Sequence, residues 1–303
     1  MTSSRLAQFY QAAGYTVVHS ASGSWFNASE QIYHSLPLSL LIEPDKEELR
    51  ELLLQHHILG VQFANKRGVG LRCLAFMVRD KGFGEASLRR TFRQNLHKAQ
   101  GCCDVREVDF EELERRGMRV NIDVMARRPY HDPRFIEPAL WHRFCHAGQF
   151  SPGAGVLGGF VGGELAAYFL YFVEDGTSYG IHLMSRHDLR RHRPNHVLYF
   201  EFTRRMIARE DVVAVSTGLQ SIPPAFAMDR FKRHAGYVAE PCHLAVALHP
   251  LASALLLNPV ASRLIDVAGQ WFPAEPRLRR VRAVVDVARA TRVSNTAAPK
   301  TVL

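Results

Sequence analysis

Between residues 177 and 236 the sequence switches repeatedly between a strand pattern and a helix pattern. Thr177–Ser185 has the length and apolar content of a strand, and a basic loop separates it from a helical pattern over His196–Glu210. A second apolar run, Asp211–Val215, and a second helical pattern, Ala225–Ala235, follow. Strands that are joined through a helix lie parallel in one sheet. This segment therefore predicts a mixed α/β layer with one parallel crossover.

A glycine-rich stretch, Gly153–Gly163, precedes this segment. Strands Val156–Val161 and Leu165–Val173 on either side of Gly162 and Gly163 predict a β-hairpin. A phosphate-binding loop is the weaker interpretation, because no helix follows the turn. The first 110 or so residues also mix strand and helix patterns, so we expect the whole chain to be of the mixed α/β (α+β) class.

The composition is that of a globular protein with one large core or two modest ones: 303 residues, of which 47% are hydrophobic and 22% are charged. The N-terminus lacks the continuous apolar block of a signal peptide, so a cytoplasmic protein is expected. The five cysteines have no metal-ligand spacing and are expected to be reduced thiols. His142, Cys145 and His146 share one helical face, but no second ligand pair accompanies them, so no metal is expected.

The net charge of +9 favours an acidic partner: a phosphorylated cofactor, RNA or an anionic membrane. The basic helical pattern over Ser87–Gln100 makes tRNA one candidate. Beyond Pro250, Leu251–Phe272 and Arg277–Arg292 have amphipathic helical patterns. The basic helix Arg277–Arg292 is a candidate for docking on an anionic membrane, which would place the protein at the inner face of that membrane.

The loop between the first strand and the first helix is the best candidate for an anion site. It contains Arg190, Arg191 and Arg193, and guanidinium groups bind phosphate through two parallel hydrogen bonds. Asn195 is expected to cap the helix that follows, with His196 next to it, and the N-terminus of a helix attracts anions. The alternative interpretation is a basic surface turn.

His182 is the candidate general base on strand Thr177–Ser185. A strand period of two puts Ser178, Gly180, His182 and Met184 on one face, where Gly180 leaves room for a substrate. Imidazole titrates in the range that acyl transfer to an amine requires. The alternative is a buried histidine that only packs in the core.

Three segments carry a resemblance to a known family. Residues 88–99, followed by 104–108, look like a basic linking segment; Arg193–Leu198 looks like an "r-x-pn-x-l" motif; Met228–Gly236 looks like an "l-x-r-FK-x-x-x-G" motif. Their order and spacing resemble the GNAT acyltransferase superfamily and, more narrowly, its bacterial FemAB-like branch, which includes CelD-like acetyltransferase domains. This resemblance implies a GNAT-type acyl-CoA N-acyltransferase fold with two tandem GNAT-like halves.

The resemblance also implies a domain organisation and an activity. Residues 1–108 would be a diverged N-terminal half, 109–250 the C-terminal half with the donor site, and 251–303 basic C-terminal helices and a tail. The implied reaction is the transfer of an acyl group from acyl-CoA to an amine, which would be a small molecule or a cell-envelope precursor. One alternative is aminoacyl transfer from aminoacyl-tRNA to a cell-wall precursor. The other is a non-catalytic binding protein on the same scaffold.

The sequence departs from the family pattern at three places. Arginines and Pro194 replace the usual glycine-rich pyrophosphate loop, and Ser216 stands where the family has an acidic residue. Phe231 stands where many GNAT enzymes have a tyrosine acid in the last helix. Lys232 is therefore the candidate proton donor or oxyanion stabiliser. The alternative for Lys232 is an ordinary surface lysine.

Overall fold

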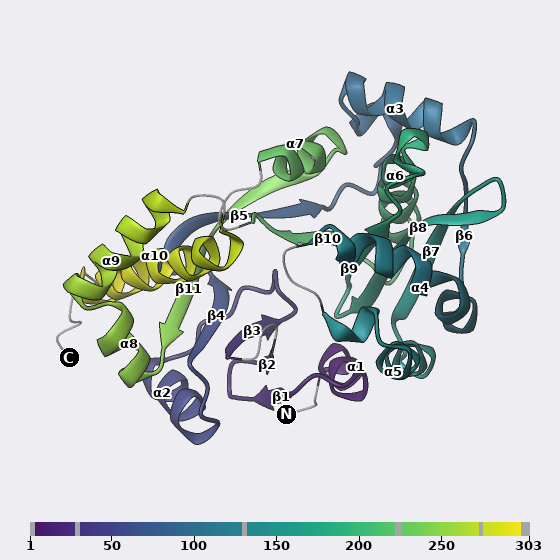
Figure 1. Ribbon diagram of the computed structural model, residues 1–303. Coiled ribbons are helices and arrows are strands. Elements are labelled where there is room, and N and C mark those ends of the chain that lie inside the picture. The colour runs from purple at the N-terminus through teal and green to yellow at the C-terminus, as the bar shows by residue number, and fades with distance from the viewer. Residues whose placement is uncertain (1–3, 28–30, 129–131, 222–225, 273–274, 298–303) are drawn as a thin grey trace. The chain divides into compact units, whose positions relative to one another are not determined.

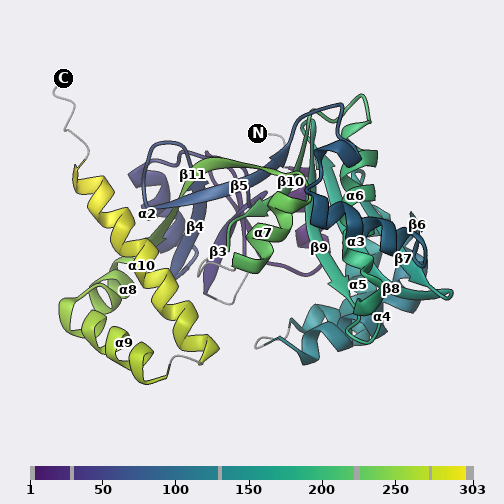
Figure 2. The ribbon, with the colours of Figure 1, turned by 90° about the horizontal axis from the view of Figure 1, so that it is seen from above.

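The computed structural model describes residues 4–27, 31–128, 132–221, 226–272 and 275–297 (Figures 1 and 2). The chain forms two compact units whose segments alternate along the sequence. Unit 1 consists of Met1–Tyr15, Phe76–Gly218 and Phe226–Ala239. Unit 2 consists of Thr16–Ala75, Leu219–Ala225 and Glu240–Leu303. Residues 76–108, which the resemblance placed in a first half, thus belong to the same unit as the expected donor site.

Unit 1 contains a sheet with the strand order β10-β9-β8-β7-β6. Its strands are β6 (Asp104–Glu107), β7 (Ala154–Val161), β8 (Glu164–Glu174), β9 (Thr177–Ser185) and β10 (Ala214–Leu219). β9 and β10 are parallel, as the crossover pattern predicts, and the other neighbours are antiparallel. β7 and β8 form the predicted glycine hairpin; Gly162 and Gly163 at its turn have φ angles of 57° and 78°, which glycine adopts without strain.

Helices cover both faces of this sheet. They are α1 (Arg5–Ala12), η1 (Glu85–Ser87), α3 (Arg90–Gln100), α4 (Phe110–Ala126), η2 (Pro133–Phe135), α5 (Pro138–Gln149), η3 (Arg190–His192), α6 (Pro194–Ile207) and α7 (Phe226–His234). On one face, Tyr168 of β8 donates a hydrogen bond to Asn121 of α4. On the other face, Phe169 of β8 stacks on Phe202 of α6 with ring centroids 4.3 Å apart. Alternate residues of β8 therefore pack under different helices, and both sides of the strand are buried.

Unit 2 contains strands in the order β1-β2-β3-β4-β11-β5. They are β1 (Val17–His19), β2 (Ser24–Phe26), β3 (Ile32–Leu36), β4 (Gly60–Asn65), β5 (Leu71–Val78) and β11 (Val238–Leu248). Its helices are α2 (Lys46–Gln55), α8 (Pro250–Leu256), α9 (Pro259–Trp271) and α10 (Pro276–Ala297). Trp25, Leu52, Val61, Phe63 and Ala245 are among the buried residues of its core. Strands and helices in both units confirm the mixed α/β class.

Two helices replace the single pattern expected over Leu251–Phe272. Pro259 begins α9 directly after Asn258, whose side-chain oxygen accepts hydrogen bonds from the backbone N–H groups of Val260 and Ala261. Proline lacks the N–H that a continuous helix needs, while asparagine is a favoured N-cap. The pair Asn258–Pro259 therefore ends one helix and starts the next. In unit 1, Ala225 of the expected helix Ala225–Ala235 lies outside the described residues, and the described helix begins at Phe226.

Candidate active site

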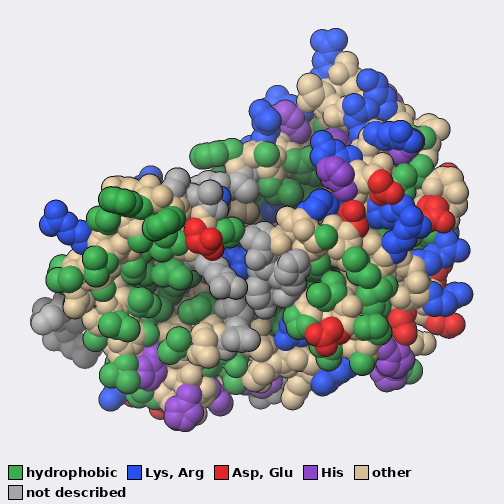
Figure 3. Space-filling view, in the orientation of Figure 1, with side chains coloured by type: hydrophobic (Ala, Val, Ile, Leu, Met, Phe, Trp, Pro, Cys, Tyr) green, Lys and Arg blue, Asp and Glu red, His purple; other side chains and the backbone are tan. Residues whose placement is uncertain are grey.

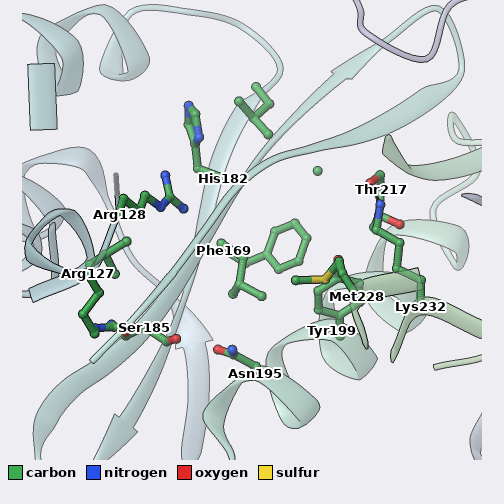
Figure 4. Close-up of a pocket in the computed structure, with 14 residues that line it drawn as sticks. Arg127, Arg128, Phe169, His182, Ser185, Asn195, Tyr199, Thr217, Met228 and Lys232 are labelled. Carbon is green, nitrogen blue, oxygen red and sulfur yellow. Dashed lines mark hydrogen bonds between the residues drawn. The ribbon is translucent and has the colours of Figure 1, made fainter. Parts of the chain in front are cut away.

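β9 and β10 run parallel over three paired residues and then separate. The pairs are Thr177 with Ala214, Ser178 with Val215, and Tyr179 with Ser216. A cavity of about 420 Å³ opens beyond the last pair (Figure 4). Its wall comes from β8, β9, β10, α4, α6 and α7: Val124, Arg127, Arg128, Phe169, Gly180, Ile181, His182, Leu183, Ser185, Asn195, Tyr199, Thr217, Met228 and Lys232. All of these residues belong to unit 1.

A β-bulge in β9 decides which side of the sheet each wall residue faces. Gly180 pairs with Tyr171 of β8, but His182 pairs with Leu170, so Ile181 is an extra residue. Adjacent partners on β8 point to opposite faces. The sequence-based expectation that Gly180 and His182 share a face is therefore wrong, because the period of two is interrupted between them.

His182 faces η2 and α5, where it packs against aromatic rings. Its ring centroid lies 4.9 Å from that of Phe135 and 6.2 Å from that of Phe144. The pKa of His182 is lowered to about 4, mainly by burial and also by the positive charge of Arg128, while the charge of Asp132 acts in the opposite direction. Its Nε2 atom is buried without a hydrogen-bond partner among the described residues. At neutral pH the imidazole is therefore uncharged and offers a hydrogen-bond acceptor in the cavity wall.

The low pKa of His182 should make the folded protein less stable at acidic pH. Because its pKa of about 4 in the folded state lies below the value of about 6.5 in an unfolded chain, the unfolded state binds the proton first. The free energy of unfolding should then fall as the pH drops from about 6.5 toward 4, and His182 should contribute about 1.4 kcal/mol per pH unit to that decline. Urea titrations at several pH values should show a shallower decline for His182→Gln. An equal decline in His182→Gln and in the exposed-site control His187→Gln would contradict this assignment.

Lys232 lies in α7 and is not a surface lysine, because only 6% of its surface is exposed. Its ammonium group donates a hydrogen bond of 2.7 Å to the carbonyl oxygen of Thr217 at the end of β10. It also lies 4.7 Å from the ring centroid of Phe76. Figure 4 shows Lys232 and Thr217 together on one side of the cavity. Lys232 is therefore buried in the cavity wall at the place where β10 separates from β9.

Tyr199 is a wall residue that the sequence analysis missed. It lies on α6, four residues after Asn195, so both side chains are on one helical face. Burial raises the pKa of Tyr199, so its phenol stays protonated at neutral pH. The i, i+4 spacing of Asn195 and Tyr199 was the available signal. Arg127 and Arg128 were also missed, because the expected charged helix ended at Arg116, whereas α4 continues to Ala126.

The basic loop after β9 ends in an unusual helix start. Arg193 occupies the N-cap of α6 in the left-handed region, with φ 56° and ψ 42°, and Pro194 is the first helical residue. The expectation that Asn195 caps the helix is wrong, because the helix begins one residue before it. Instead, the Asn195 side chain lies in the cavity wall, and its Oδ1 atom is buried without a hydrogen-bond partner in the described part of the chain.

The other residues expected to bind a cofactor lie outside this wall. Arg190 and Arg191 are exposed in η3, next to the N-terminus of α6. His196 packs between the rings of Phe92 and Phe231, with centroids 4.8 and 5.1 Å away. Burial lowers the pKa of His196 to about 4. Phe231, at the family's tyrosine position, is thus part of an aromatic cluster between α3, α6 and α7.

No group of three or more His, Cys, Asp or Glu side chains suited to a metal ion occurs among the described residues. The ring of His142 contacts the carboxylate of Glu114, with Nδ1 and Oε1 2.9 Å apart. Burial raises the pKa of the Cys145 thiol well above its usual range. The polar side chains in the cavity wall are those of Lys232, His182, Tyr199, Asn195, Thr217, Ser185 and the two arginines that follow α4, Arg127 and Arg128.

Comparisons with known proteins identify a family for part of the chain and structures that share its fold. Residues 86–220 match the model of the acetyltransferase (GNAT) domain family. No curated protein matches the sequence. Among solved structures, FemX is similar with a TM-score of 0.55 and 9% identity, over 84% of this chain and 93% of FemX.

Two further structures have the same fold. The C-terminal domain of a protein assigned as a lysylphosphatidylglycerol synthetase from Agrobacterium fabrum has a TM-score of 0.54 and 14% identity, over 88% of this chain and 92% of that domain. A conserved protein of unknown function from Bacteroides thetaiotaomicron has a TM-score of 0.52 and 10% identity, over 80% and 88% of the two chains. The segment 86–220 therefore matches the acetyltransferase (GNAT) domain family, in a chain that shares its fold with FemX.

Proposed function

We propose that this protein transfers an acyl group from acyl-CoA to the amine of an acceptor. The observation that carries the proposal is the buried ammonium of Lys232 in the wall of the cavity between β9 and β10. A cation at this place stabilises the oxyanion that forms when an amine attacks the acyl carbonyl. The cavity of about 420 Å³ has room for the acyl group and part of the pantetheine arm.

The start of α6 supports the placement of the donor. Asn195 lies in the cavity wall, and the exposed Arg190 and Arg191 lie beside the same helix terminus. The positive end of the helix dipole and the two guanidinium groups favour a diphosphate. The diphosphate of CoA would lie outside the cavity, with the thioester end reaching toward Lys232.

The wall residues suggest how the reaction proceeds. The amine nitrogen bonds to the carbonyl carbon, the carbonyl π electrons move to oxygen, and Lys232 stabilises that oxyanion. Collapse of the intermediate breaks the carbon–sulfur bond and re-forms the carbonyl. The amine proton passes to the leaving thiolate, because a His182 with a pKa of about 4 accepts a hydrogen bond but does not retain the proton at neutral pH. Burial keeps the phenol of Tyr199 protonated in the same cavity wall.

The acceptor would enter from the α4 side. Arg127 and Arg128 line the cavity there, on the side of β9 that His182 faces (Figure 4). Arg127 is oriented by Asp123, which it contacts at 2.6 Å, and by the carbonyl of Ser185 at 2.8 Å. Arg128 and the Arg127–Asp123 ion pair together carry one net positive charge, which favours an acceptor with an anionic group.

The test is thiol release from a panel of acyl-CoAs in the presence of amines with and without a phosphate or carboxylate group. We expect release that requires both substrates. Arg190→Gln together with Arg191→Gln should raise the KM for acyl-CoA about tenfold and leave kcat unchanged, because the diphosphate lies away from the reacting carbonyl. The matched control is Arg50→Gln together with Arg67→Gln, two exposed arginines of unit 2. An equal KM in both double variants would contradict the donor placement.

Aminoacyl-tRNA is the second candidate donor, favoured by the surface over α3, η3 and α7. Exposed basic residues of unit 1 gather there: Arg89, Arg90, Lys98, Arg190, Arg191, Arg230 and Arg233. Figure 3 shows lysine and arginine side chains over α3. A phosphate backbone binds such a surface through counterion release. Transfer from aminoacylated tRNA, without turnover of any acyl-CoA, would replace the first proposal by this one. Tight binding of donor or acceptor without turnover of either would indicate a binding protein.

A further inference from the structure

An apolar surface of unit 2 is independent of the cavity in unit 1. The described part of α8 and α9 exposes large hydrophobic side chains to solvent: Leu251 (76%), Leu255 (68%), Val260 (68%), Leu264 (64%), Val267 (41%) and Trp271 (76%), followed by Phe272 (61%). Figure 3 shows hydrophobic side chains gathered over α8, α9 and α10. We call these seven residues the apolar stripe. A contiguous exposed apolar surface of this kind marks an interaction site.

The spacing within α9 shows that four residues of the stripe share one helical face. Val260, Leu264, Val267 and Trp271 follow one another at intervals of four, three and four residues, which is the period of a single helical face. The opposite face of α9 packs on α10, where Asp266 forms ion pairs with Arg282 and Arg289. α9 therefore turns its polar partners inward to α10 and its apolar residues outward, the reverse of a surface helix in a globular protein.

Neither helix is long enough to cross a bilayer. No single helix among the described residues has the length and hydropathy of a membrane span. α8 and α9 reach that hydropathy only together, and a bend of 55° separates them. Short apolar helices with a sharp bend fit the plane of the membrane interface better than its hydrocarbon core. Trp271 and Phe272 end the stripe, and tryptophan is enriched at the headgroup level of membranes.

The surrounding charge fits an anionic surface. From residue 250 to 297 the chain has seven arginines and three acidic residues. Arg263 and Arg279 are exposed, and Arg263 lies on α9 directly before Leu264. The basic helix expected to dock, Arg277–Arg292, has an inner side of its own: Val285 and Val287 are buried in α10. The apolar contact therefore falls to α8 and α9, and the arginines add electrostatic attraction.

We propose that α8 and α9 dock this protein on an anionic lipid bilayer, with the apolar stripe inserted at the interface. Docking would place the enzyme beside acceptors that are themselves lipids or are anchored in the membrane. The proposal rests on residues of unit 2 alone, so vesicle binding tests it independently of the acyl-transfer proposal for unit 1.

The experiment is flotation of the full chain with vesicles of phosphatidylcholine, with and without about one-third phosphatidylglycerol. We expect binding to the anionic vesicles and about fivefold weaker binding for each of Arg263→Gln and Arg279→Gln. Leu255→Glu together with Leu264→Glu should weaken binding by at least about tenfold, because each change removes an inserted side chain and adds a negative charge. The matched control is Phe150→Glu together with Val213→Glu, two exposed apolar residues of unit 1.

Each outcome decides the proposal. Both double variants should keep the melting temperature of the parent chain, since all four positions are exposed. Equal vesicle binding by the stripe variant and its control would overturn the proposal. The proposal would also be overturned if the parent chain did not bind vesicles but formed a dimer, and if Leu255→Glu together with Leu264→Glu converted that dimer to a monomer. The stripe would then be an interface between two copies. Thiol release with a soluble amine should be the same in the stripe variant and the parent.

Discussion

Replacing Lys232 by methionine is expected to lower acyl transfer about 100- to 1,000-fold. Methionine has nearly the length and volume of the lysine stem, so it should fill the same space beside Phe76. It lacks the ammonium that we propose stabilises the oxyanion, and the loss of one such donor has an effect of this size. The measurement is kcat/KM for thiol release, with the affinity for the acyl donor determined separately by calorimetry. Donor affinity should change little, because the interaction matters in the transition state.

Arg233→Met is the matched control. Arg233 is the next residue of α7, is exposed, and also lies near the Phe76 ring, at 5.8 Å from its centroid. Its loss removes the same charge from the same helix without changing the cavity wall. Full activity of Lys232→Met in a folded protein would remove the main support for an oxyanion site. A folded Lys232→Met that no longer binds the donor would assign Lys232 to binding instead.

Gly180→Val should close the cavity and lower kcat/KM about 100-fold. A Cβ atom at Gly180 would lie 2.7 and 2.8 Å from two ring carbons of Phe169, closer than real side chains approach. Phe169 is itself stacked on Phe202, so its ring has little room to move except into the cavity. Overpacking of this kind costs about 1–3 kcal/mol, which corresponds to about 5- to 150-fold in binding or rate.

A graded series tests this explanation. Gly180→Ala should have an intermediate effect of about tenfold, because alanine lacks the branched methyl groups of valine. Gly101→Ala is the control: an added Cβ at Gly101 meets no atom closer than 3.9 Å. Calorimetry should show weaker donor binding in proportion to side-chain size. Unchanged donor affinity in Gly180→Val would mean that the donor does not occupy the space beside Phe169.

The order of elements in unit 1 follows well from the sequence. The glycine hairpin, the parallel crossover and the helices on either side of β10 all depend on local patterns of a few residues, and the structure contains each of them. Lys232 and Asn195 were also found from local motifs, and both lie in the cavity wall. Their roles remain predictions.

The remaining details depend on contacts between distant segments. Because of the bulge at Ile181, His182 lies on the face of the sheet opposite to the expected one. The bulge is visible only from the pairing of β9 with β8. Arg193 takes a left-handed conformation that asparagine or glycine usually adopts, so the sequence pointed to Asn195 as the cap instead. The sequence left Lys232 open between a catalytic candidate and a surface lysine, and only its contacts with the carbonyl of Thr217 and the ring of Phe76 show that it is buried.

The alternation of the two units along the chain has a consequence for synthesis on the ribosome. β4 pairs along six residues with β11. Gly60 can therefore pair with Leu248 only after almost 190 further residues have been translated. At about 5–20 residues per second, the first strands of unit 2 remain without this partner for roughly 10 to 40 seconds. Unit 1 meanwhile receives all of its segments up to Ala239. We therefore expect unit 1 to fold first in the cell and unpartnered strands of unit 2 to be the part that a ribosome-associated chaperone protects.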